Sequence, residues 1–290
     1  MILDRLRDVV LRGPCDAVLF SGGVDSTAVA YVHAPGRPLL INVQLLGGGG
    51  SDVPYAVAVA ERMGMPLVVR YVTVGEALGA VANVVKILQV FNPMEVVNCA
   101  AVYIGLLEAK MRGLSRVCTG DGGDELCIGY DFMLRKGVNE LASYLHHMRG
   151  RWYFCSFDIG KALGVSVKAP FLEIEEFLMS IPPEEKIKCG MGKCLLRLEL
   201  EKALGGLGRR RKDPIEVGSG FRKLYDALTT LGRDIDVDIP VRGAAKYLYY
   251  LFRNMGLSYT RGDTKPCPVC GSETDGRYCK MCGWYRDNPV

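Results

Sequence analysis

The stretch AVLFSGGVDSTAV, residues 17–29, predicts the first structural unit of the fold. Its four apolar residues, 17–20, are typical of a buried strand, and the two glycines that follow after Ser21 indicate a tight turn. An Ala- and Val-rich helix is expected to continue to about Tyr31. A glycine turn therefore lies between a buried strand and the N-terminus of a helix.

The same alternation of strand and helix continues along the first part of the chain. Further strands are expected at 39–43, 67–72 and 115–119, and helices at 52–63, about 76–90 and 93–112. Such alternation predicts the α/β class, with a Rossmann-like parallel sheet covered by helices on both faces. We expect an α/β domain at 1–135, a mainly helical continuation at 136–260 and a small cysteine-rich unit at 261–290.

Composition excludes several classes of protein. The chain has 290 residues, of which 49% are hydrophobic and 23% charged, which is typical of a globular protein rather than a disordered one. No run of eighteen apolar residues predicts a membrane span, and the charged N-terminus does not resemble a secretory signal. We therefore expect a cytoplasmic protein whose seven scattered cysteines are free thiols packed as small hydrophobic residues. A net charge of +4 is too small to indicate nucleic-acid binding by itself.

The first glycine turn, SGGVDST at 21–27, has the composition of a phosphate-binding loop. Backbone N–H groups at a helix N-terminus favour an anion, glycines allow close approach, and hydroxyl groups add donors. The residues expected to contact phosphate are Ser21, Gly22, Gly23, Asp25, Ser26 and Thr27. A Gly-Gly pair is also found in plain strand-to-helix connections, but a carboxylate at Asp25 favours a phosphate site in which Mg²⁺ bridges the two groups.

A second glycine turn, TGDGGDELCIGYD at 119–131, follows the fourth predicted strand and contains the acids Asp121, Asp124 and Glu125. Taken alone, it is also compatible with a capped helix start. Ligands of open parallel sheets bind at the carboxyl ends of the strands, where the winding direction changes. In a strand order 3-2-1-4-5 both turns face one crevice, and Asp25 and Asp124 are predicted to share Mg²⁺ on a nucleoside triphosphate.

Two further features point in different directions. The basic run at 209–212 is interpreted as a solvated loop, the commoner explanation of adjacent cations. Near the C-terminus, Cys267-x2-Cys270-x8-Cys279-x2-Cys282 has the spacing of a zinc ribbon, in which four thiolates hold one structural Zn²⁺.

Together these segments resemble a known family. SGGVDS resembles the pyrophosphatase loop of the N-type ATP pyrophosphatases (the PP-loop superfamily), and GDGGDELCIGY is similar to the GEGxDELFGGY segment of the synthetase domain of asparagine synthetases. KAPFLEIEEFL, GMGKCLLRLEL and RRRKDPIEVGSG resemble further family segments in the same order, over about residues 15–225. The resemblance implies a fold of the adenine nucleotide alpha hydrolase (HUP) type.

The family resemblance implies an ATP- and Mg²⁺-dependent ligase that forms an amide. A carboxylate, aspartate or a similar acid, attacks the α-phosphorus of ATP and releases pyrophosphate, and ammonia then displaces AMP. On this resemblance Lys193 stabilises the developing negative charge, and Asp121, at a position where the family has glutamate, assists the nucleophile. Val43 and Gly120 are expected to contact the nucleoside.

The sequence departs from the family in two respects. It lacks the glutaminase domain that begins with a catalytic cysteine, so ammonia is expected to arrive free or from a separate amidotransferase partner. It adds the predicted zinc ribbon. Because some tRNA-thiolating enzymes combine an SGGxDS domain with zinc ribbons, adenylation of a tRNA nucleobase is the alternative function, with tRNA as the partner. GDGGDEL favours the amide-forming branch.

Overall fold

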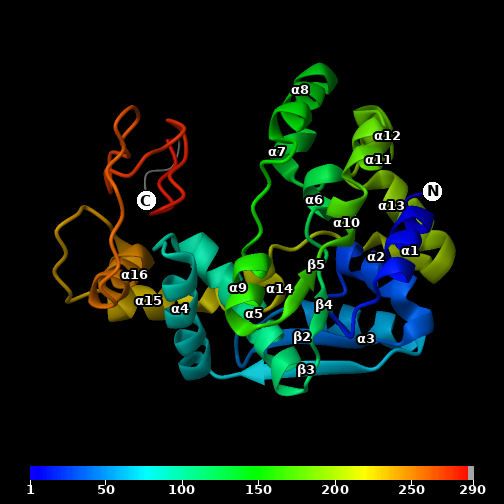
Figure 1. Ribbon diagram of the computed structural model, residues 1–290, viewed down its shortest axis with the longest axis horizontal. Coiled ribbons are helices and arrows are strands. Elements are labelled where there is room, and N and C mark those ends of the chain that lie inside the picture. The colour runs from blue at the N-terminus through cyan, green and yellow to red at the C-terminus, as the bar shows by residue number, and fades with distance from the viewer. Residues whose placement is uncertain (287–290) are drawn as a thin grey trace. The chain divides into compact units, whose positions relative to one another are not determined.

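The computed structural model describes residues 1–286, which contain one five-stranded sheet of order β3-β2-β1-β4-β5 (Figure 1). Its strands are β1 (Ala17–Leu19), β2 (Leu39–Leu45), β3 (Leu67–Val72), β4 (Arg116–Cys118) and β5 (Ser166–Lys168). β1 pairs in parallel with both β2 and β4, and β4 pairs in parallel with β5. The predicted order and the α/β class are confirmed.

Helices follow the strands along the chain. In the first half they are α1 (Ile2–Arg12), α2 (Val24–His33), η1 (Ala34–Gly36), α3 (Asp52–Met63), α4 (Val74–Leu88), α5 (Pro93–Met111), α6 (Gly123–Leu126), α7 (Asp131–Leu134) and α8 (Val138–Met148). In the second half they are α9 (Cys155–Leu163), α10 (Pro170–Glu173), α11 (Glu175–Ser180), α12 (Pro183–Ile187), α13 (Cys194–Leu204), η2 (Gly205–Arg209), α14 (Ile215–Gly218), η3 (Phe221–Lys223), α15 (Leu224–Leu231) and α16 (Gly243–Asn254).

The chain divides into two compact units that do not follow its linear order. The first comprises Met1–Val43, Ser51–Arg70 and Gly105–Pro214, and the second comprises Gln44–Gly50, Tyr71–Ile104 and Ile215–Val290. Each unit therefore draws on several stretches of sequence. The division at residues 135 and 260 stays a prediction.

Helices cover both faces of β1 in the first unit. Val18 belongs to a buried apolar cluster with residues of α1, α2 and α3, including Leu6 and Val29. Leu19 faces the other way, since successive side chains of a strand alternate. A Cβ on Gly105 of α5 would lie 2.8 Å from Leu19 Cδ2, so this helix rests directly on the opposite face. The predicted two-sided covering is confirmed.

The predicted order includes a fifth strand, but its residues were not predicted. β5 lies within 136–260, the part of the chain for which we expected helices, and spans only three residues. It is at the edge of the sheet next to β4, and none of its residues is fully buried. A short, half-exposed edge strand has too few apolar positions to produce a periodic signal.

No single helix within residues 1–286 is long and apolar enough to cross a membrane. One bent pair, α4 with α5, meets the length and composition criteria together, with an angle of 110° between the two helices.

The prediction that all the scattered cysteines are free thiols is wrong. Cys15, just before β1, forms a disulfide with Cys118 at the end of β4, and Cys189 forms one with Cys194. Cys127 is free and buried. Sequence spacing did not reveal the first pair because its members are 103 residues apart and meet only through the sheet.

The disulfide between Cys15 and Cys118 is expected to stabilise the first unit. Because it closes a long loop, replacing both residues by alanine should lower the free energy of unfolding by about 2–5 kcal/mol. Urea denaturation without reductant measures the difference from the wild type. In a thiol reductant most of that difference should disappear; a loss of equal size in both conditions would mean that the cysteines contribute packing alone.

Candidate functional site

The two glycine turns meet at the carboxyl ends of β1 and β4. They can approach so closely because the glycines of the second turn have no side chain. A Cβ on Gly120 would lie 3.0 Å from Asp25 Cβ, and one on Gly123 would lie 2.5 Å from Asp25 Cγ. The first distance is at the limit of contact and the second is a steric overlap. The backbone of Gly120 and Gly123 therefore lies against Asp25, and the two turns meet as expected from a strand order in which β1 lies beside β4.

Two carboxylates and two ammonium groups form a cluster at this junction. Lys193 Nζ is ion-paired with Asp25 Oδ2 and lies 2.6 Å from Asp124 Oδ1. Lys212 Nζ lies 2.6 Å from Asp124 Oδ2, and it also sits 3.9 Å from the centre of the Tyr130 ring. The structure thus brings together Asp25, Asp124 and Lys193, three residues singled out in the sequence, and adds a fourth.

Lys193 reaches the cluster from an unusual backbone conformation. Its φ is 62°, in the left-handed region that non-glycine residues seldom adopt, and its N–H donates to the carbonyl of Cys127 at 3.0 Å. Only 3% of its side chain is exposed. A Cβ on Gly129 would lie 1.9 Å from Asp124 Oδ1 and 2.3 Å from Lys193 Cε, so this position must be glycine for the ion pair to form.

The cluster changes the acidity of its members. Burial raises the pKa of Asp25, and the nearby Asp124 adds to that shift, although Lys193 opposes it. Burial would also raise the pKa of Asp124, but Lys193 and Lys212 outweigh it and lower the pKa. The pKa of Lys193 is raised despite burial because two carboxylates face it. The lysine therefore keeps its proton over the whole physiological range.

The first glycine turn is held by its own hydroxyl groups. Gly23 N–H donates to Ser21 Oγ at 3.1 Å, and Ser26 Oγ lies 3.2 Å both from Ser21 Oγ and from the Gly23 carbonyl. Gly22 has a φ of 71°, and a Cβ there would lie 2.6 Å from the backbone nitrogen of Ala56. The turn is therefore packed tightly against α3.

Two buried oxygen atoms of the first turn and its helix have no partner. Asp25 Oδ1 and Thr27 Oγ1 are inaccessible to solvent and make no hydrogen bond. Native proteins pair nearly all such atoms, and an exception points to a bound ion, water or ligand. A carboxylate oxygen beside a hydroxyl group and a helix N-terminus suits a metal-bound phosphate group.

The remaining predicted residues are Asp121, Val43 and Gly120. Asp121 is held by two hydroxyl groups, with Oδ2 accepting from Thr119 Oγ1 at 2.9 Å and from Ser156 Oγ at 2.5 Å. Burial raises its pKa, and the two hydrogen bonds offset part of the shift. Val43 is buried on β2. Gly120, placed against Asp25, and Val43 remain predicted nucleoside contacts.

Glu125 is one of the acids named in the second turn, but no role was predicted from the sequence for it or for Tyr130. Tyr130 donates its hydroxyl to Glu125 Oε1, and both residues are largely buried. Burial raises the pKa of Glu125 to about 7, against the opposing hydrogen bond from Tyr130. Burial is a property of the folded chain, so the motif alone carried no signal of this shift.

The interpretation of the basic run 209–212 as a solvated loop is wrong for Arg210, which is buried and paired with Asp52 at 2.5 Å. Lys212 is exposed, but its ammonium group is ion-paired with Asp124 of the carboxylate cluster. Arg209, by contrast, is half-exposed and bridges to Glu201, and Arg211 is exposed. The one available signal was the position of the run next to the GSG stretch, which had been matched to the family.

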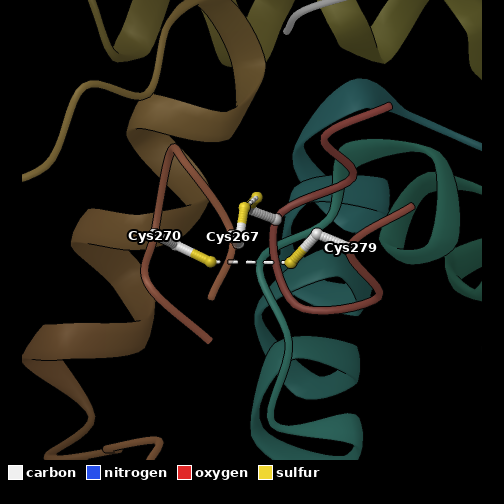
Figure 2. A group of neighbouring side chains, drawn as sticks. Cys267, Cys270 and Cys279 are labelled. Atoms are coloured by element: carbon white, nitrogen blue, oxygen red, sulfur yellow. Dashed lines mark hydrogen bonds between the residues drawn. The ribbon is translucent and has the colours of Figure 1, made fainter. Parts of the chain in front are cut away.

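The four C-terminal cysteines form a compact cluster in the second unit (Figure 2). All four are buried, and their sulfur atoms lie within 4.8 Å of one another. Cys267 Sγ lies 3.6 Å from Cys282 Sγ, and Cys270 Sγ lies 3.6 Å from Cys279 Sγ. Zn–S bonds of about 2.3 Å in a tetrahedron separate the sulfurs by about 3.8 Å, so the spacing is compatible with Zn²⁺.

The cysteine cluster is anchored to helices of its own unit. Phe91, just before α5, donates its N–H to the Met281 carbonyl at 2.9 Å, and Tyr259 donates its hydroxyl to the Cys270 carbonyl at 2.8 Å. The Phe91 ring packs edge-on against Tyr249 and Phe252 of α16. The segment around the cysteines therefore shares an aromatic core with α16.

Comparison with known proteins finds sequence similarity to asparagine synthetases. Residues 14–154 match the asparagine synthase family model. Over 231 residues the chain is 26% identical to "asparagine synthetase B [glutamine-hydrolyzing]" of Escherichia coli, covering 70% of this chain and 41% of that protein. A "putative asparagine synthetase [glutamine-hydrolyzing] 1" of Methanocaldococcus jannaschii is 28% identical over 64% of this chain and 35% of its own length.

A plant relative gives a similar result. The chain is 28% identical to an "asparagine synthetase [glutamine-hydrolyzing]" of Asparagus officinalis, over 61% of this chain and 33% of that protein. The aligned part of the chain thus spans between a third and about two fifths of the length of these three curated relatives.

Removing the Lys193 charge should destabilise the protein in a pH-dependent way. In Lys193→Met two buried carboxylates lose a cation, which should cost about 3–5 kcal/mol near pH 7. The folded-state pKa of Asp25, which burial already raises in the wild type, then rises further, and the pKa of Asp124 rises as well because only Lys212 still lowers it. Protonation favours the folded form of the variant, and the deficit should shrink as the pH falls towards about 4.

Urea denaturation at a series of pH values measures this deficit. Lys188→Met is the matched control, because Lys188 is an exposed lysine paired with Glu185 and should cost almost nothing. A Lys193→Met deficit that did not depend on pH would contradict the charge cluster.

Proposed function

We propose that the chain is an ATP- and Mg²⁺-dependent ligase that forms an amide, acting as asparagine synthetases do. The observation that carries the proposal is the cluster of Asp25, Asp124, Lys193 and Lys212 at the carboxyl ends of two neighbouring parallel strands. The asparagine synthase match over residues 14–154 supports the same reaction. A carboxylate oxygen attacks the α-phosphorus of ATP, the bond to the β-phosphate breaks, and pyrophosphate leaves.

The glycine turn 21–27 binds the phosphates in this proposal. It supplies the N–H groups at the start of α2, a ten-residue helix whose dipole favours an anion. The unpartnered hydroxyl of Thr27 is available as a donor to phosphate oxygen. These uncharged backbone and hydroxyl donors orient the triphosphate. The negative charge of the phosphates is neutralised by other groups.

Asp25 and Asp124 are the residues that would hold Mg²⁺. Carboxylate oxygens are the ligands this ion prefers, and Asp25 Oδ1 is buried without a hydrogen bond. Bound there, the ion would neutralise part of the charge on the phosphates. The two carboxylates lie within reach of the same ammonium group, which supports a shared site.

Lys193 and Lys212 supply fixed positive charge in this reaction. The raised pKa of Lys193 keeps it protonated, so it can stabilise the charge that develops on the α-phosphate and on the leaving pyrophosphate. Lys212 enters from a separate segment and contacts the same Asp124. Two cations from different segments surround the reacting phosphates without needing to move a proton.

Asp121 is the proposed proton acceptor for the attacking amine. Its carboxylate has a raised pKa, which brings it closer to the range where a general base works well. Thr119 and Ser156 fix its orientation. The nitrogen of ammonia attacks the acyl carbon, AMP departs and the amine proton passes to this carboxylate. We propose free ammonia or a separate amidotransferase as the source, and aspartate or a similar acid as the substrate.

Pyrophosphate release tests the proposed reaction directly. With ATP, Mg²⁺, aspartate and ammonia the wild type should release pyrophosphate, and Asp124→Asn should lose at least about two orders of magnitude of that rate while staying folded. Asp131→Asn, an acid outside the cluster, is the control. Release that required unmodified tRNA and ignored aspartate would support nucleobase adenylation and overturn amide formation.

We also propose that the cysteine cluster holds one structural Zn²⁺. Four buried thiols at tetrahedral spacing support a site whose ligands are all protein, which leaves no position for a substrate. Because metal binding contributes to folding of so small a unit, the ion should stabilise the aromatic core that joins the ribbon to α16.

Metal analysis tests this assignment. The purified protein should contain about one zinc per chain, and Cys279→Ser should lose the metal and lower the melting temperature. Cys127→Ala is the matched control, since Cys127 is also a buried free cysteine but lies outside the cluster. Retention of zinc by Cys279→Ser would contradict the site.

A further inference from the structure

We propose that Arg210 is a positioning residue that fixes the phosphate-binding turn and the segment carrying Lys212 relative to one another. The effect on ATP rests on the proposed function, whereas the effect on the turn itself can be measured without nucleotide. Within residues 1–286, the hydrogen bonds and ion pairs of Arg210 do not include any member of the carboxylate cluster. It acts through the backbone of Ser21.

The guanidinium group of Arg210 joins three segments of the first unit. Nη1 donates to the Ser21 carbonyl at 2.6 Å, and Nη2 donates to Asp52 Oδ1 at 2.5 Å and to Asp213 Oδ2 at 3.3 Å. Its Cζ lies 4.3 Å from the centre of the Tyr55 ring on α3. Only 3% of the side chain is exposed, so these contacts are made away from bulk water.

The contact with Ser21 bears directly on the phosphate-binding turn. Ser21 is the residue at which β1 gives way to the two glycines, and its hydroxyl accepts the Gly23 N–H. A carbonyl at such a turn has no partner in a strand or helix, and Arg210 supplies its donor. Movement of Ser21 would therefore shift the N–H groups that begin α2.

The backbone of Arg210 is hydrogen-bonded to Arg197, which also contacts the segment that carries Lys193. Arg197 donates from Nη1 to the Arg210 carbonyl at 2.6 Å and from Nε to the Gly192 carbonyl at 2.8 Å. Gly192 precedes Lys193, and Arg210 stands two residues before Lys212. One pair of buried arginines thus connects the phosphate-binding turn to the segments that carry both cluster lysines.

Geometry as well as charge is needed at this position. Arginine presents donors in a planar fork and can serve the Ser21 carbonyl and the Asp52 carboxylate at once, whereas the lysine ammonium is a single point on a flexible stem. Arg210→Lys keeps the positive charge that balances the buried Asp52. The variant should therefore fold while losing the fixed connection to Ser21.

Hydrogen exchange of the nucleotide-free protein tests the proposal. Arg210→Lys should speed exchange of the amides at residues 22–27 by about tenfold or more relative to the wild type. Arg211→Lys, an exposed neighbour on the same segment, should leave them unchanged. Equal exchange in the two variants would overturn the proposal, and this comparison holds whether or not the chain binds ATP.

Steady-state kinetics of pyrophosphate release give the second measurement. A purely structural role would reduce the active fraction, hence the apparent kcat, and leave the KM for ATP unchanged. Positioning predicts that the KM for ATP in Arg210→Lys rises by about tenfold, with the melting temperature close to that of Arg211→Lys. An unchanged KM with a lowered kcat would assign Arg210 to stability alone. A wild type that bound no MgATP would refute the proposed function, while the exchange comparison would still decide the role of Arg210.

Discussion

The site depends on one buried interaction, the pairing of two carboxylates with two lysines where β1 and β4 end side by side. Asp25 and Asp124 would repel each other if they stood alone in this buried place, and the pKa values of both would rise. Lys193 and Lys212 make the arrangement tolerable by adding two positive charges. Gly123 and Gly129 are needed for this pairing, because a Cβ at either position would overlap a carboxylate.

The cluster could be predicted from the sequence because β1 and β4 are parallel neighbours in the sheet. The alternation of apolar runs and helices indicated the sheet, and parallel strands present their carboxyl ends on one edge, so two acidic glycine turns had to meet there. The strand order and the meeting of the turns were correctly predicted on that basis. The cysteine cluster could also be predicted from spacing alone. Its four cysteines are so close in sequence that they can meet without the rest of the fold. Such features depend on local sequence and one simple rule of topology.

Features that depend on distant partners escaped prediction. Arg210 and Asp52 are separated by 158 residues, and a run of four cations looks like a solvated loop until those partners are known. The disulfide between Cys15 and Cys118 likewise joins two residues that the sheet alone brings together. β5 was missed for a related reason, because its three residues are ordered by pairing with β4 rather than by an apolar pattern of their own. In each case the sequence shows the residue but not its environment in the folded chain. That environment decides whether a charge is buried, whether two thiols meet and whether a short segment pairs as a strand.

The balance of charge in the cluster explains how the same residues can be stable without a ligand and ready for one. The charges of two carboxylates and two ammonium groups sum to zero, and this pairing offsets part of the desolvation penalty of burying them. Under the proposed function the two carboxylates would hold Mg²⁺, and the two ammonium groups would pair with phosphate oxygens, which carry the opposite charge. Each lysine then exchanges one anionic partner for another. The left-handed backbone conformation of Lys193 and the proposed anchoring of the Lys212 segment by Arg210 would keep both cations in place during that exchange. Under the proposed function, charge that is already fixed would stabilise the leaving pyrophosphate without reorganisation, so rigidity at these two positions would favour the reaction.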